Sequence, residues 1–284
     1  MIRLLHIEWI KLWNNRWSKL LLFGYLFLLT SIALIAAIRF DIGPVKFHLA
    51  DQGIFNFPYI WHFNTFIAAW MKLFLAIIIV SMTANEYSYK TIKQNLIDGL
   101  SHADFLKTKV YMVLALALAS TLLIALMSGI LGGVFSDYTT PSLVFQDISF
   151  LAAYFVKLVT FFSFCLFAGV LVKRSAFALG FIVIWQIFEG ILTGLLYWKA
   201  FKNDTAIVAA ETAEQITSFF PLVSMYSLIK QPFTRLNGIQ TVAKQVGETF
   251  ENAYQTTAME YIVALFWAGL FIWGTHQLLK RRDL

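Results

Sequence analysis

The chain has little of what a soluble enzyme or a disulfide-bonded protein needs. It contains a single cysteine, Cys165, which excludes a disulfide framework and any thiolate metal cluster built from this chain alone. Charged residues make up only 13% of its 284 residues, against about 25% in soluble globular proteins. Its 28 Phe, 11 Tyr and 9 Trp leave too little polar chain for disorder. The remainder is 59% hydrophobic, which is typical of a membrane protein.

Catalytic motifs are also missing. The sequence has no Walker A phosphate loop, no Gly-x-Gly-x-x-Gly, no His-Glu-x-x-His and no Gly-x-Ser-x-Gly. An intramembrane protease would need paired ionisable side chains within its spans, and Glu189 is the only carboxylate well inside an apolar run. We therefore expect no catalytic residue, no metal site and no cofactor on this chain. Any energy source must be a partner protein or an ion gradient.

Six apolar runs are long enough to cross a bilayer, which needs about 20 helical residues. They lie at residues 19–39, 63–84, 110–135, 148–172, 177–198 and 257–279. The sequence thus predicts an all-α membrane protein with one transmembrane domain over residues 1–284. The first run is longer than the apolar part of a signal peptide, so we expect it to remain as a span.

Residues 1–18 predict an amphipathic helix in the membrane interface. At 100° per residue one face collects the apolar side chains Ile2, Leu5, Trp9, Leu12 and Trp13. The alternative is that this segment forms the first turns of the first span. With both termini cytoplasmic, thirteen Lys and Arg lie on cytoplasmic segments and seven on external ones, as the positive-inside rule requires. The net charge of +6 is then a topology signal, and we expect no nucleic-acid partner.

Two segments between the spans are long. Residues 85–109 form the cytoplasmic loop, and residues 199–255 form an external segment. In the latter, Pro221 interrupts an uncharged stretch that is too short to span, so we expect short re-entrant or interfacial helices there, and a polar helix at 239–254. Four aromatic side chains before the second span are expected at the lipid boundary: Phe55, Phe57, Tyr59 and Trp61.

Three ionisable residues lie within the spans at one depth. Lys72, Lys157 and Glu189 are each ten residues from the outer end of a run, which is roughly 13–15 Å below the boundary. Isolated charges there cost about 2.5–3.5 kcal/mol each, so we expect these residues to line a candidate intramembrane cavity in which Glu189 contacts a lysine. The alternative is that both lysines extend outward to the interface.

The loop at 85–109 has the features of a compact helix–turn–helix. A short helix fits residues 88–97, and Asp98-Gly99 is a stop and turn signal. Ser101 is then a good N-cap, with Asp104 three residues later as its partner. Such a loop can transmit force as a rigid body, although an ordinary structured connector is the alternative.

Within this loop the chain resembles the type-2 ABC exporter permease family. The matching positions are Glu86, Tyr87, Lys90-Thr91, Leu96, Ser101 and Lys109. Asp98-Gly99 stands where that family commonly has a proline, and His102 stands where it commonly has an arginine. The overall plan is also similar, because an interfacial helix precedes six spans and a long external segment precedes the last one.

The resemblance implies a permease subunit of an ATP-driven exporter. A separate ATP-binding cassette ATPase subunit, carrying the ATP and Mg, would grip the coupling residues Glu86, Tyr87, Tyr89, Lys90, Thr91, Leu96, Ser101, His102 and Lys109. A second permease copy or a paralogue would complete the pathway, in a bacterial cytoplasmic (inner) membrane. The residues themselves leave two alternatives open: a gradient-driven secondary transporter, and a non-transporting membrane immunity or scaffold protein.

Overall fold

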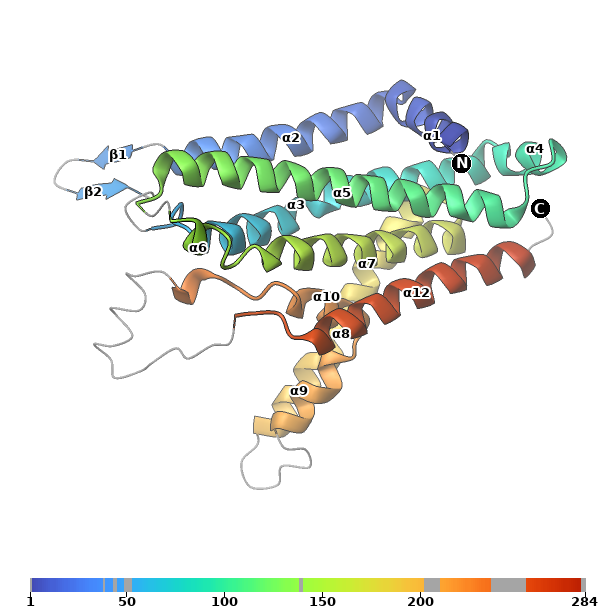
Figure 1. Cartoon of the computed structure of the whole chain (residues 1–284). Coiled ribbons are helices and arrows are strands. Elements are labelled where there is room, and N and C mark those ends of the chain that lie inside the picture. The colour runs from blue at the N-terminus through green and yellow to red at the C-terminus, as the bar shows by residue number, and fades with distance from the viewer. Residues whose placement is uncertain are drawn as a thin grey trace.

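The computed structural model describes residues 2–37, 39–42, 45–48, 53–137, 140–201, 210–235 and 254–281, and these are mostly helical (Figure 1). The elements in chain order are α1 (Ile2–Asn14), α2 (Arg16–Ala37), β1 (Arg39–Ile42), β2 (Val45–His48), α3 (Tyr59–Ser88), α4 (Thr91–Ile97), α5 (His102–Phe135), α6 (Pro141–Val144), α7 (Ser149–Val172), α8 (Ser175–Phe201), α9 (Ala210–Ser218), α10 (Pro221–Ser227), η2 (Phe233–Arg235) and α12 (Ala258–Arg281).

Five helical segments in the described part of the chain are long and apolar enough to cross a membrane. They are Tyr59–Ser88, His102–Phe135, Pro141–Val172, Ser175–Trp198 and Ala258–Arg281. These segments indicate a helical membrane protein. The first predicted span, at 19–39, is occupied by α2, and a count of six spans remains a prediction.

Helix α7 forms the centre of the bundle. It is apolar on all sides, which is typical of a helix in the core of a protein or in a membrane span. Figure 1 shows α7 between α5 and α12, and its Phe162 and Leu158 are fully buried. The hydroxyl of Thr160 donates to the carbonyl of Ala264 in α12 at 3.2 Å, which adds a polar contact between the two helices.

A cluster of three hydroxyl groups joins α7 to two other helices in the core. Tyr154 in α7 lies 3.0 Å from the Ser120 hydroxyl in α5 and 3.2 Å from the Tyr25 hydroxyl in α2. Tyr25 and Ser120 are also hydrogen-bonded to each other. All three side chains are buried, so each polar group finds its partner within the cluster.

The two ends of the bundle differ. Figure 1 shows the start of α1, all of α4 and the end of α12 at one end. The opposite end carries α6 and an antiparallel hairpin in which β1 pairs with β2, with Arg39 opposite His48. Helix α8 runs across the other long helices rather than alongside them, and most of its apolar surface is exposed.

The four aromatic residues around the start of α3 are buried in the protein, so the prediction that they lie at the lipid boundary was wrong. Phe55, Phe57 and Trp61 are buried together, and Tyr59 donates a hydrogen bond to the carbonyl of Pro232 at 3.0 Å. The Phe57 ring packs directly on Gly132 of α5, where an added Cβ would lie 2.3 Å from the ring. The missing side chain at Gly132 therefore makes room for the ring.

The segment that the sequence predicts to be external is broken at Pro221, as expected. Helix α9 ends at Ser218, Phe220 is extended, and Pro221 occupies the first turn of α10. Leu222 and Met225 of α10 are buried in the main core. The polar helix expected at 239–254 lies, apart from Tyr254, outside the described residues.

Candidate functional sites

The loop between α3 and α5 folds as a tight helical hairpin. Helix α3 continues to Ser88, and Lys90 then takes a left-handed conformation with φ of 57° before α4 starts at Thr91. The prediction that the short helix begins at residue 88 was wrong, because that residue completes the last turn of α3. The Thr91 hydroxyl donates to the carbonyl of Glu86 at 3.3 Å and fixes the first turn.

The second turn of this loop follows the sequence prediction. Gly99 has φ of 93°, a conformation in which a Cβ is strained. The backbone NH of Asp104 donates to the Ser101 hydroxyl at 3.1 Å, which confirms Ser101 as the N-cap of α5. The Ser101 hydroxyl donates in turn to the Asp104 carboxylate at 2.6 Å.

Four charged side chains at the base of the loop form one ion cluster, which we call the base cluster: Glu8, Lys11, Glu86 and Lys109. Lys109 binds Glu8 at 2.6 Å and also binds Glu86, while Lys11 lies 3.0 Å from Glu8 and 3.1 Å from Glu86. Each carboxylate is thus shared by both ammonium groups, and the four formal charges cancel. The base cluster joins α1, α3 and α5 where the loop begins and ends.

The electrostatics of the base cluster favour its charged form. Burial acts to raise the pKa of the Glu8 carboxyl, but the ammonium groups of Lys109 and Lys11 outweigh it, so the pKa lies below its usual value. Burial acts to lower the pKa of Lys11, but the carboxylates of Glu8 and Glu86 outweigh it and the pKa is raised. The Oε2 atom of Glu86 is buried and has no hydrogen-bond partner among the described residues.

The predicted coupling residues divide into a buried group and an exposed group. Glu86 and Lys109 are buried and therefore hold the loop rather than form its surface. Tyr89, Lys90 and Ser101 are exposed. A third set is partly buried: Tyr87, Thr91 and His102. Leu96 lies in α4.

The exposed surface of the loop combines apolar and basic side chains. Tyr89 and Ile97 are 76% and 77% exposed at the two ends of α4. A groove of about 500 Å³ separates the loop from the turn between α7 and α8. Four cations line it: Lys90, Lys93, Lys173 and Arg174. The surface therefore suits a protein partner that offers an apolar pocket and acidic side chains.

The sequence analysis missed Glu8 and Lys11 as members of this site. On a helical wheel Glu8 falls outside the apolar face predicted for residues 1–18, so the pattern alone does not indicate that it is buried. In the folded chain Glu8 is buried, and its carboxylate accepts a hydrogen bond from Lys109 of α5. The only local signal is the spacing of Glu8 and Lys11, three residues apart on one helix, which pairs their charges.

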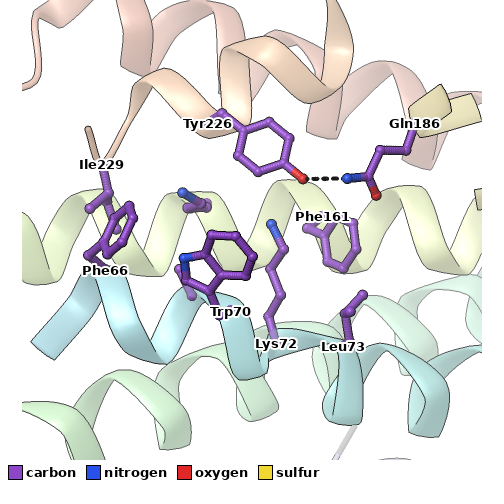
Figure 2. A pocket seen from close by; sticks show the side chains of 10 residues that line it. Phe66, Trp70, Lys72, Leu73, Phe161, Gln186, Tyr226 and Ile229 are labelled. Carbon is purple, nitrogen blue, oxygen red and sulfur yellow. Dashed lines mark hydrogen bonds between the residues drawn. The ribbon is translucent and has the colours of Figure 1, made fainter. Parts of the chain in front are cut away.

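A second site lies inside the bundle, where Lys72 of α3 and Lys157 of α7 line one cavity of about 200 Å³. Aromatic rings surround the ammonium groups: the Lys72 nitrogen lies 4.3 Å from the ring centre of Phe161 and 5.0 Å from that of Tyr226. The Lys157 nitrogen lies 5.5 Å from the same Tyr226 ring. Figure 2 shows the hydrogen bond between the Tyr226 hydroxyl and Gln186, which measures 3.0 Å and joins α10 to α8 at the cavity.

Glu189 is directed elsewhere. Its carboxylate accepts hydrogen bonds from the Trp185 indole at 3.0 Å and from the backbone NH of Val223 at 2.8 Å. The expected contact with a lysine is absent from the described part of the chain, and the carboxylate instead binds these two donors. Glu189 thus holds α10 against α8 and leaves the cavity lysines without it.

No protein-family model, curated protein or solved structure matches the chain.

Proposed function

We propose that this chain is the membrane-spanning permease subunit of an ATP-driven exporter. In this proposal six helices span a bacterial cytoplasmic membrane, both termini are cytoplasmic, and a separate ATP-binding cassette subunit holds the ATP and Mg. Two copies, or one copy and a paralogue, would form the pathway. The observation that supports the proposal best is the helical hairpin around α4, which is anchored by the buried base cluster.

A driven permease needs a stiff connection between its motor and its spans. Helix α3 runs without interruption from Tyr59 to Ser88, so any tilt of the loop moves a whole span. Lys109 binds both Glu8 and Glu86, so α1 and α5 must move with α3. A force applied to α4 is thereby distributed over three helices rather than lost in a flexible connection.

The hairpin also offers a surface on which a motor can act. Tyr89 and Ile97 are large, apolar and exposed beyond the ends of the long apolar helices, where no lipid would cover them. An ATPase subunit with a cleft that receives these two side chains would bind the loop tightly enough to move it in both directions.

Stimulated ATP hydrolysis tests the proposal. The chain is co-expressed with a cassette ATPase sought among the neighbouring reading frames, and any complex is purified in neutral detergent. We expect copurification and ATPase activity that falls at least tenfold in the double variant Tyr89→Ala, Ile97→Ala. Phe145→Ala removes another large exposed ring, at the opposite end of the bundle, and is the control. An unchanged activity in the double variant would refute the role of the loop. A complete lack of association would favour a gradient-driven transporter or a scaffold protein.

Membrane sidedness is tested separately with thiol labelling. Cys165 is the only cysteine of the chain and is buried, so it gives little background. We expect Lys93→Cys to resist a membrane-impermeant maleimide in spheroplasts and Phe145→Cys to react. The reverse pattern would place the hairpin outside and overturn the proposal.

A further inference from the structure

We propose that the cavity between α3, α7, α8 and α10 binds the acidic head group of an amphiphile, a phosphate or carboxylate carried on an apolar chain. Lys72 and Lys157 are only 6% and 3% exposed, and both ammonium groups line the cavity. This binding site is proposed independently of the proposed function. Only the further step, that the bound amphiphile is the exported substrate, rests on the proposed function.

The charge of the cavity is not balanced by the chain. Neither Lys72 nor Lys157 makes an ion pair or a hydrogen bond with any described residue. Their contacts are the faces of Phe161 and Tyr226, which attract cations but cannot neutralise them. Two ammonium groups in one apolar cavity also repel each other. An anion bound beside them would remove both penalties, so the cavity is suited to a negatively charged group.

The depth and opening of the cavity favour an amphiphile over a free anion. Lys72 lies near the middle of α3, about 20 Å from either end of the helix. The side chains at the rim, Trp70, Leu73 and Gln186, are exposed on the outer surface of the bundle. Figure 2 shows the Trp70 ring beside the Lys72 side chain, so the apolar rim and the charge are adjacent. A hydrated ion would have to cross hydrocarbon to reach this opening, whereas an acyl chain would remain in it.

The size of the cavity agrees with a head group rather than a whole molecule. About 200 Å³ is several times the volume of a water molecule, about 30 Å³, so a phosphate or a carboxylate fits with room for a water. The attached chain would leave past Trp70 and Leu73 along the apolar surface. Gln186 and the Tyr226 hydroxyl add donors at the rim for the remaining oxygens of the head group.

Direct binding to the purified chain tests this assignment without an ATPase. The chain is held in dodecyl maltoside, a neutral amphiphile of the same chain length as the probe, and titrated with dodecyl phosphate by calorimetry. We expect Lys72→Met and Lys157→Met each to weaken binding about tenfold or more, because each removes one charge-assisted contact. Lys107→Met removes an exposed lysine outside the cavity and is the charge-matched control.

Thermal stability separates loss of binding from loss of fold. Methionine relieves an unpaired buried charge, so we expect the unliganded Lys72→Met chain to be at least as stable as the wild type. Dodecyl phosphate should raise the melting temperature of the wild type but not of this variant. The assignment is overturned if the wild type does not bind dodecyl phosphate, if both lysine variants bind it as the control does, or if inorganic phosphate binds equally tightly. A chain that binds dodecyl phosphate but no ATPase would refute the proposed function alone.

Discussion

Replacing Lys109 by methionine tests whether the base cluster holds the loop. Methionine is unbranched like lysine and one atom shorter, so it fills most of the same space and removes the charge. The carboxylates of Glu8 and Glu86 would then remain buried, with Lys11 as their one remaining cation in the base cluster. The matched variant is Lys11→Met, which leaves Lys109 to neutralise the same two carboxylates from within the core.

The structure predicts a large difference between the two substitutions. Lys109 is almost fully buried, and removing one partner of a buried ion pair typically costs 3–5 kcal/mol. Because Lys11 still bridges both carboxylates, we expect a cost near the lower limit, about 3 kcal/mol. The Lys11 side chain is 39% exposed, and water screens its contribution, so we expect Lys11→Met to cost about 1 kcal/mol or less.

The free energy of unfolding is measured for both variants at pH 7, by titrating purified chain in mixed micelles with a denaturing detergent. Adding Glu8→Gln to Lys109→Met should recover part of the loss, because it removes one of the two buried negative charges. The reasoning is refuted if Lys109→Met destabilises the chain no more than Lys11→Met. In the proposed complex with an ATPase, Lys109→Met should also reduce stimulated hydrolysis while leaving the exposed surface of α4 intact.

Three further predictions concern other parts of the chain. Folding lowers the pKa of Glu8, so the contribution of this carboxylate to stability is complete above its ordinary pKa of 4.5 and is lost as the pH falls through the lower pKa of the folded state. When the free energy of unfolding is measured against pH, this acid-dependent component should be missing in the Glu8→Gln variant. An unchanged pH profile in that variant would contradict the prediction. Gly132→Ala should lower the free energy of unfolding by about 1–3 kcal/mol, because the added Cβ displaces the Phe57 ring. The control Gly133→Ala places its Cβ in open space and should be neutral or slightly stabilising. Equal effects of the two variants would contradict the close packing of Phe57 on Gly132. Tyr154→Phe should lower the free energy of unfolding by only about 0.6 kcal/mol and at most about 1.7 kcal/mol, because the hydroxyl groups of Tyr25 and Ser120 stay bonded to each other. A larger loss in the same unfolding assay would show that Tyr154 holds the cluster together.

The features that the sequence predicts correctly depend on contacts close in the chain. Ser101 caps α5 because its hydroxyl meets the backbone NH of a residue three positions later. Gly99 turns the chain because the required backbone conformation is local. Pro221 separates α9 from α10 for the same reason, since its ring excludes the preceding residue from a continuous helix.

The features that the sequence misses depend on contacts between distant segments. Glu8 is buried by α3 and α5, which lie far from it in the chain, and its helical wheel gives no sign of this. Phe57 is buried in the protein rather than exposed to lipid because Gly132, 75 positions later in the chain, leaves space for its ring. The depth of Lys72 and Lys157 could be counted from the sequence, but the donors that take Glu189 away from them, Trp185 and Val223, could not.

The two groups of buried charge show why the cavity needs an explanation outside the chain. In the base cluster two carboxylates and two ammonium groups cancel, so the folded chain alone accounts for their burial. The cavity is lined by two lysines, Lys72 and Lys157, and the carboxylate predicted at their depth, Glu189, is held by other donors. Two apolar side chains in place of Lys72 and Lys157 would make the folded chain more stable, because a buried unpaired charge is costly. An anion that enters the cavity would supply the negative charge that the described chain does not place there, and this is the chemistry that the titration with dodecyl phosphate measures.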